Sequence, residues 1–201
     1  IGFLTYSEGC NDDVNKAMWS GLGWDPDADV TQMLREYSRY FIGEGYTDSF
    51  AQALLALERN WVGPLATNSG VMTTLAQLQE MERTASPQTK ANWRFQQALY
   101  RAYYDAYTHQ RVRDESGLEE AALEQLRNVD KTGALMAMDQ AEALLRRSET
   151  HRIAVDLRQR VFELAEALYQ SIRMQLSVEK YGAIDVGRGA NLDTIDVPLN
   201  N

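Results

Sequence analysis

The sequence has 201 residues, of which 44% are hydrophobic, and its formal net charge is −9. A chain of this length can form one good-sized domain with a buried core. Its acidic surface repels the phosphates of nucleic acids and of anionic membranes, so we expect neither as a partner. No apolar run approaches the roughly 20 residues that cross a bilayer. Cys10 is the only cysteine, which excludes an intrachain disulfide.

The chain begins with a short apolar and aromatic run, Ile1 to Tyr6, which is typical of a buried strand. One strand cannot satisfy its own backbone hydrogen bonds, so this run needs partner strands or a second copy. We therefore expect a strand remnant from a larger protein. The expected divisions are 1–25 as the end of a barrel-like strand and helix unit, 26–181 as a helical bundle domain and 182–201 as an irregular C-terminal tail.

Helical periodicity predicts a series of helices after Gly9. Caps and breakers mark their ends: Asp27 or Asp29 is suited to cap the second helix, and Gly43 ends it. A final amphipathic helix has the most regular apolar stripe. The predicted helices cover about residues 11–22, 30–41, 47–61, 71–84, 87–113, 116–129 and 149–179. A kink or break is expected near residues 130–133, followed by a new apolar stripe through Met138, Ala141 and Leu145. The fold class is therefore all-α: an irregular bundle of six to eight helices, preceded by one short strand remnant.

A dense cluster of polar groups follows the predicted strand. Glu8 stands where the strand ends, and Asp12 and Asp13 fall in the first turn of the next helix. Parallel barrels present catalytic groups at the carboxyl ends of their strands, and two carboxylates can perform acid and base work on a glycosidic bond. Glu8 is the candidate catalytic residue. The alternative is that the aspartates cap the helix and Glu8 is a turn residue.

Five short stretches carry a resemblance to a known group of enzymes: Tyr6-Ser7-Glu8-Gly9, Asn11 to Lys16, Leu22 to Pro26, Leu34 to Tyr37, and Arg39-Tyr40-Phe41. Together with Trp19 they resemble the end of the (β/α)8 barrel in secreted glycoside hydrolases of the α-glucuronidase and β-hexosaminidase-like groups, over about residues 1–45. The resemblance implies a glycan ligand, a secreted or periplasmic location, and a catalytic barrel that this helical region would support. It also implies that this chain alone does not hydrolyse glycosides.

Aromatic residues form the second candidate feature. Trp93, Tyr100, Tyr104 and Tyr107 share one face of a predicted helix, where they could form a core stripe or stack on sugar rings. The candidate substrate-binding residues are Tyr6, Asp12, Asp13, Trp19 and Trp24. The tryptophans at 19, 24 and 61 could equally anchor a core or an interface.

Metal and cofactor chemistry have little support in the sequence. The histidines are His109 and His151, and neither has the Glu-x-x-His spacing of a helical di-iron site. Asp105 and His109 share a helix face and are expected to form a solvated pair. We expect no metal and no cofactor. The function expected is that of a C-terminal helical domain of a carbohydrate-active enzyme; the alternative is a non-catalytic module for protein interaction or self-association, including a homo-oligomer.

Overall fold

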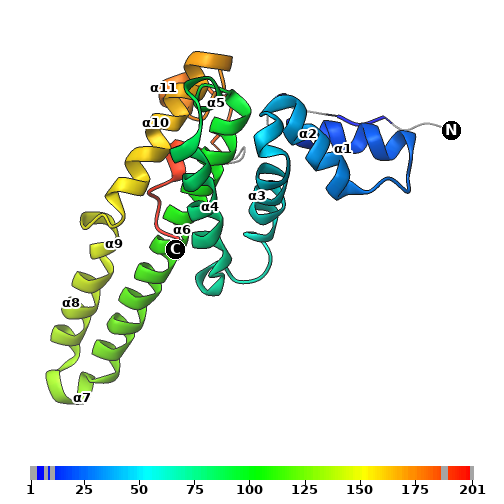
Figure 1. Cartoon of the computed structure of the whole chain (residues 1–201). Helices are drawn as coiled ribbons and strands as arrows, with labels where there is room; N and C mark the ends of the chain where they lie inside the picture. The colour runs from blue at the N-terminus through cyan, green and yellow to red at the C-terminus, as the bar shows by residue number, and fades with distance from the viewer. Residues whose placement is uncertain (1–3, 7–8, 10–11, 187–189, 200–201) are drawn as a thin grey trace.

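The computed structural model describes residues 4–6, 9, 12–186 and 190–199, and these ranges fold as a multi-helix assembly (Figure 1). The all-α prediction is confirmed. The helices are α1 Asp13–Trp24, α2 Val30–Phe41, α3 Thr47–Arg59, α4 Gly70–Thr84, α5 Pro87–Lys90, α6 Trp93–Arg127, α7 Val129–Thr132, α8 Ala134–Leu145, α9 Arg147–Thr150, α10 Val155–Ile172 and α11 Val178–Tyr181. Single 3-10 turns occur at Glu44–Tyr46, Leu65–Thr67 and Leu192–Thr194.

The expected N-terminal strand is absent from the part of the run that is described. Residues 4–6 have no regular secondary structure, and the side chain of Leu4 is fully exposed. Residues 1–3 lie outside the described ranges. The physical reason is that a strand needs a partner for its backbone hydrogen bonds. Among the described residues no second strand offers such a partner.

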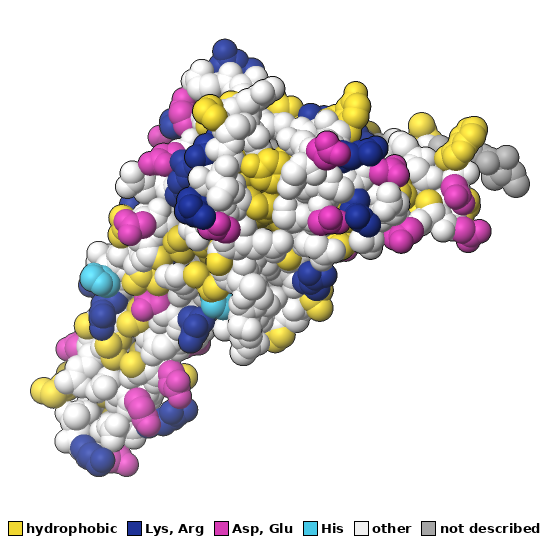
Figure 2. Space-filling view, in the orientation of Figure 1, with side chains coloured by type: hydrophobic (Ala, Val, Ile, Leu, Met, Phe, Trp, Pro, Cys, Tyr) yellow, Lys and Arg dark blue, Asp and Glu magenta, His cyan; other side chains and the backbone are white. Residues whose placement is uncertain are grey.

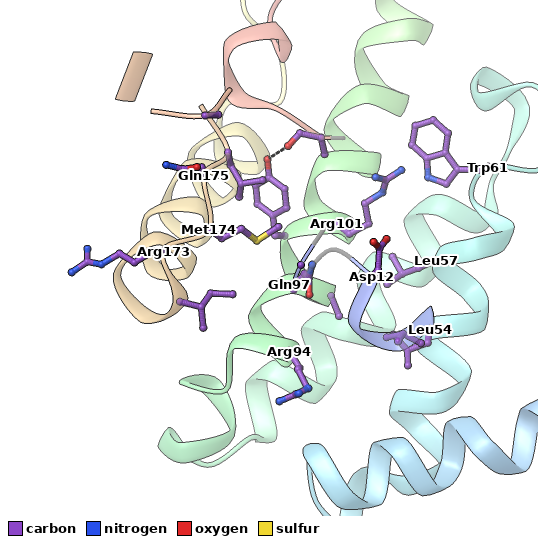
Figure 3. A pocket seen from close by; sticks show the side chains of 18 of the residues that line it. Asp12, Leu54, Leu57, Trp61, Arg94, Gln97, Arg101, Arg173, Met174 and Gln175 are labelled. Atoms are coloured by element: carbon purple, nitrogen blue, oxygen red, sulfur yellow. Dashed lines mark hydrogen bonds between the residues drawn. The ribbon is translucent and has the colours of Figure 1, made fainter. Parts of the chain in front are cut away.

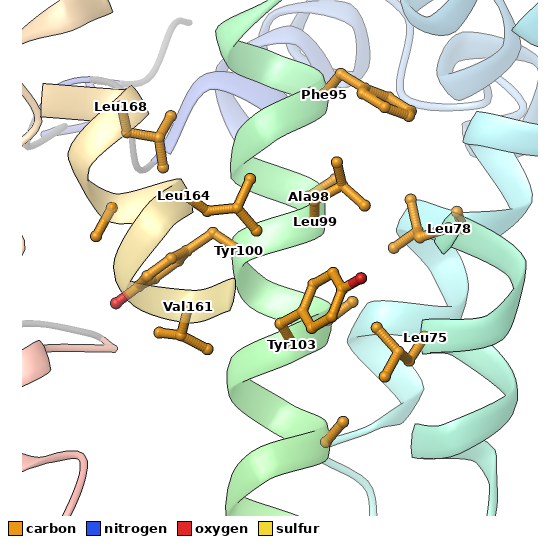
Figure 4. Packing of buried hydrophobic residues seen from close by; sticks show 14 of the residues in the cluster. Leu75, Leu78, Phe95, Ala98, Leu99, Tyr100, Tyr103, Val161, Leu164 and Leu168 are labelled. Carbon is orange, nitrogen blue, oxygen red and sulfur yellow. The ribbon is translucent and has the colours of Figure 1, made fainter. Parts of the chain in front are cut away.

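The long helix α6 is the axis of the molecule. Its first half packs between α4 on one side and α10 on the other, as Figure 4 shows for Leu75, Leu78, Val161 and Leu164. The aromatic stripe on α6 is core: Tyr100 is buried, and Trp93 and Tyr104 pack against the same cluster, as does the buried Tyr107. The prediction that these spacings indicate a core face is therefore confirmed.

Of the two boundaries that the sequence predicts in and after α6, one is wrong and one is confirmed. The sequence suggested a break before Ser116, because Ser116 to Glu119 has the pattern of a capping box. The helix instead continues through Gly117 to Arg127. The reason is tertiary, since the same turns of α6 pack against α8 and are held in a helix by that contact. The predicted break near 130–133 is confirmed, and Gly133 there has a φ of 83°.

The last predicted helix, 149–179, is also interrupted. The helix α10 begins at Val155 and ends at Ile172, because Arg173 adopts the left-handed conformation with a φ of 58°. Its N–H closes the helix on the carbonyls of Leu168 and Tyr169. The chain then runs through the buried Leu176 into α11.

The C-terminal residues 190–199 are irregular, as predicted, but they are firmly attached to α6 and α10. Leu192 and Ile195 belong to the central hydrophobic cluster. The phenol of Tyr100 donates to the carbonyl of Ala190 at 2.6 Å, and Arg158 binds the carboxylate of Asp196 through both Nε and a terminal nitrogen, at 2.7–3.0 Å. We call residues 190–199 the C-terminal strap.

The strap also completes a buried ion pair. Arg111 and Glu115 lie one turn apart on α6 and bind each other. Arg111 additionally donates to the carbonyls of Ile195 and Val197, while Glu115 accepts the N–H of Leu199. A buried charge pair is tolerated only when its remaining hydrogen-bonding groups are satisfied, and here the strap backbone satisfies them.

Candidate functional site

The structure separates the residues that the sequence suggested for substrate binding. Tyr6 and Trp24 are largely exposed, at 80% and 92%. Trp19 is half-buried on α1. Glu8, the catalytic candidate, lies outside the described residues. Tyr6, Trp19 and Trp24 do not line the main cavity of the described structure, whereas Asp12 does.

Asp13 is engaged in holding three helices together. It lies at the start of α1 and accepts hydrogen bonds from the phenol of Tyr37 on α2 at 2.5 Å and from Nε of Arg94 on α6 at 2.7 Å. The Arg94 guanidinium also stacks on the rings of Phe41 and Trp93, at 3.9 Å and 4.2 Å from their centroids. Burial favours the neutral acid, but the hydrogen bonds from Arg94 and Tyr37 outweigh it and lower the pKa of Asp13.

A cavity of about 840 Å³ opens between α3, the first half of α6 and the segment after α10 (Figure 3). One wall is apolar and includes Leu54 and Leu57 of α3. Polar side chains of α6 form the floor, and residues 172–176 form the opposite wall. A volume of this size is in the range of small-molecule sites in proteins, which is about 300–1,000 Å³.

Asp12, Arg101 and Trp61 lie on the same side of this cavity (Figure 3). The Arg101 guanidinium is 4.3 Å from the centroid of the Trp61 ring, a cation–π contact. Trp61 remains 56% exposed, so part of the indole is available to a ligand. Gln97, one turn before Arg101 on α6, adds a planar amide to the same cavity.

Arg101 is held in place by a buried carboxylate. Its Nε lies 2.8 Å from Asp105, which is almost wholly buried. Asp105 also accepts from the side-chain amide of Asn60 at 3.0 Å, and Asn60 in turn accepts from Thr74 at 3.2 Å. Burial raises the pKa of Asp105, although Arg101 and Asn60 favour its ionised form. The network fixes the position of Arg101, and through it that of Trp61.

The expected solvated pair of Asp105 and His109 is wrong. Both side chains are buried, at 1% and 3% exposure, because this face of α6 is covered by neighbouring helices. Asp105 is instead paired with Arg101 and Asn60. Burial, together with the nearby charge of Arg113, lowers the pKa of His109 and favours its neutral form.

The comparisons with protein-family models, with curated proteins and with solved structures find no match for this chain. Within the described ranges, no group of three or more His, Cys, Asp or Glu side chains could hold a metal ion. None of the helices described is long and apolar enough to span a bilayer. The interpretation of the site therefore depends on its own geometry.

Sequence reasoning had one signal that could have located this site. Arg101 and Asp105 are spaced i, i+4 on a face otherwise rich in buried aromatics, and an Arg and an Asp on such a face must be paired. Nothing in the sequence indicated that Trp61 and Asn60 belong to this site. These residues reach α6 only because α3 folds back against it.

Proposed function

We propose that this chain is the C-terminal helical part of a carbohydrate-active, glycoside hydrolase-like enzyme, and that its cavity binds part of a glycan. One observation carries the proposal. Asp12 belongs to the stretch that resembles glycoside hydrolases, and it lines the same cavity as the exposed indole of Trp61 and the polar side chains of Arg101 and Gln97.

The chemistry of this cavity suits a sugar ring. The C–H face of a pyranose is apolar and stacks on an aromatic ring, whereas its hydroxyl groups hydrogen-bond to planar polar side chains. The cavity offers both kinds of group: Trp61 for stacking, and Asp12, Gln97 and Arg101 for hydrogen bonds. Because Arg101 is anchored by Asp105, little side-chain freedom would be lost when a ligand binds.

The role proposed for this chain is binding and support of a catalytic barrel, without hydrolysis of its own. Glycoside hydrolysis requires two carboxyl groups on opposite sides of the scissile bond. Of the two aspartates near the start of α1, Asp13 is tied to Arg94 and Tyr37 and is not available as a partner for Asp12. Asp12 and Asp13 therefore do not form such a pair.

The test is calorimetric titration of the chain with a panel of oligosaccharides, neutral and uronic-acid-containing, comparing Trp61→Ala with Trp24→Ala. Both variants remove one exposed indole, but Trp24 lies on α1 and does not line the cavity. Loss of one stacked ring costs roughly 1–3 kcal/mol, judged from aromatic stacking on planar ligands. We expect Trp61→Ala to weaken binding at least about fivefold and Trp24→Ala to leave it unchanged.

Two results would contradict the proposal. One is the absence of binding to every glycan in the panel. The other is an equal loss of affinity in the two tryptophan variants, which would place the ligand away from the cavity.

A further inference from the structure

The carboxylate of Asp105 differs in its environment from the charged groups of the surface. Figure 2 shows acidic and basic side chains interspersed over the face in view, where water screens their charges. Asp105 is buried, and it lies on α6 one turn after the cavity residue Arg101. A buried carboxylate stays charged only while its neighbours stabilise the charge.

Two residues that line the cavity depend on this one buried charge. The Nε of Arg101 lies 2.8 Å from Oδ1 of Asp105. The side chain of Trp61 also favours the ionised form of Asp105, and the Arg101 guanidinium covers the Trp61 ring at 4.3 Å from its centroid. Both residues line the cavity. The charge of Asp105 therefore orients the ligand-facing groups of the site.

The two oxygens of this carboxylate are satisfied in different ways. Oδ2 accepts a hydrogen bond from the side-chain amide of Asn60 at 3.0 Å. In the described part of the chain no hydrogen bond of good geometry reaches Oδ1, which is instead paired with the opposite charge of Arg101. A proton on Oδ1 would displace no hydrogen bond, and it would remove the charge that attracts the guanidinium.

We propose that Asp105 is a positioning residue of the cavity: its charge holds Arg101 and Trp61 in the arrangement that binds a ligand, and its protonation in mild acid releases both. The affinity of the site then falls with pH while the chain stays folded. The identity of the ligand rests on the proposed function, whereas the release of the two side chains requires no ligand.

The surroundings of this carboxyl suit a titrating group. The charged and titratable groups near it lie on α6, and they are Arg101, Tyr104 and His109. The side chains that face it from the end of α3 and from α4, directly or through an amide, do not titrate: Asn60, Trp61 and Thr74. Burial raises the pKa of Asp105 above the ordinary value of about 3.9, against the opposing effects of Arg101 and Asn60.

Protonation of Asp105 releases the site without unfolding the chain. A raised carboxyl pKa means that the folded chain binds the proton more tightly than the unfolded chain does. As the pH falls through this pKa, Asp105 therefore contributes a relative gain in stability, the opposite of a carboxylate whose pKa is lowered by ion pairing. The loss of affinity is thus separable from acid unfolding.

The first test is an NMR titration of the isotope-labelled, ligand-free chain. We expect the carboxyl carbon of Asp105, the Nε–H of Arg101 and the indole N–H of Trp61 to shift together, with one midpoint above about pH 3.9. Asp105→Asn should abolish the shifts at Arg101 and Trp61. The matched control is His109→Gln, which removes the neighbouring buried titratable group and should keep them.

Circular dichroism confirms that each variant is folded, and the titration of the parent chain decides the matter if Asp105→Asn does not fold. A midpoint at or below about pH 3.9 would overturn the inference. So would shifts of Arg101 and Trp61 that do not follow the Asp105 carboxyl, or shifts that disappear in His109→Gln.

The second test is calorimetry over a range of pH with the tightest-binding neutral oligosaccharide of the panel, which itself has no titrating group. One pH unit below the midpoint, about a tenth of the chains keeps the charged carboxylate, so the apparent affinity should be about tenfold weaker. Asp105→Asn should bind at least about fivefold more weakly than the parent chain at about pH 7, with no further loss in acid. His109→Gln should keep the parent profile.

The two tests separate this inference from the proposed function. An affinity that stays constant across the Asp105 midpoint would overturn the inference and leave glycan binding intact. Absence of binding to every glycan would contradict the proposed function, and the NMR titration would still decide whether Asp105 positions Arg101 and Trp61.

Discussion

The two halves of α6 show how differently one continuous helix can be stabilised. From Phe95 to Arg111 the helix is surrounded by α4, α10 and the C-terminal strap. From residue 112 to Arg127 it packs chiefly on α8, where the buried residues include Ala122 of α6 and Ala137 and Ala141 of α8. We call this hairpin, residues 112–145, the arm. The helical hydrogen bonds are the same in both halves. What differs is the apolar area that each turn buries, so local stability is decided by tertiary contacts.

The largest expected effect on the free energy of unfolding comes from truncating one leucine in each half of α6. Leu99→Ala removes a side chain that is 1% exposed and should lower the free energy of unfolding by about 2–5 kcal/mol. Leu123→Ala removes the same atoms from an exposed position and should cost well under about 1 kcal/mol. Urea unfolding followed by circular dichroism measures both. Similar losses at the two positions would show that the arm is as tightly packed as the body.

The second test concerns the anchor of the strap and depends on pH. Burial opposes the charge of Asp196, but Arg158 and Tyr107 lower its pKa below the ordinary value of about 3.9. A carboxylate with a lowered pKa contributes stability above the unfolded-state pKa and loses it as the pH falls through the folded-state pKa.

We therefore expect Asp196→Asn to lower the free energy of unfolding by about 1–2 kcal/mol at pH 7, since a hydrogen-bonded charge pair is lost. The difference from the parent chain should shrink as the pH falls from about 4 toward 2. The matched control is Asp139→Asn, an exposed position on α8 in the arm, which should change little. A deficit in Asp196→Asn that stayed constant with pH would mean that its charge is not what anchors the strap.

The smallest expected effect is a gain in stability, whereas the two preceding predictions are losses. Gly117 lies inside α6 with helical geometry, and a Cβ added there meets no atom within 4 Å. Gly117→Ala should therefore stabilise the arm half of α6 by about 0.5–1 kcal/mol. Gly133→Ala is the control, because a φ of 83° strains any residue with a Cβ and makes this change destabilising. Hydrogen exchange in residues 112–127 reports both effects locally. A destabilising Gly117→Ala would mean that the helix needs flexibility at that position.

The exposed indoles illustrate why the candidate site could be predicted only in part. Asp12 was identified from the sequence because it belongs to a stretch with a recognisable pattern, and it does line the cavity. Trp24 belongs to the same stretch but is exposed on α1, and Trp61 takes the place beside Arg101 instead. Nothing local distinguishes the two tryptophans, because their environments depend on how α1 and α3 sit against α6.

The sequence by itself determined the features that depend on near neighbours along the chain. Apolar periodicity specified the helical class. Asp29 begins α2 by accepting hydrogen bonds from the N–H groups of Thr31 and Gln32, and Gly133 breaks the helical path at the tip of the arm. Only the tertiary structure decided that α6 runs unbroken through Gly117 and that the strap is fastened to Arg111 and Arg158. The reason is range: caps and periodicity act within a few residues, whereas burial and ion pairing require partners that are distant in sequence and meet only when the chain has folded.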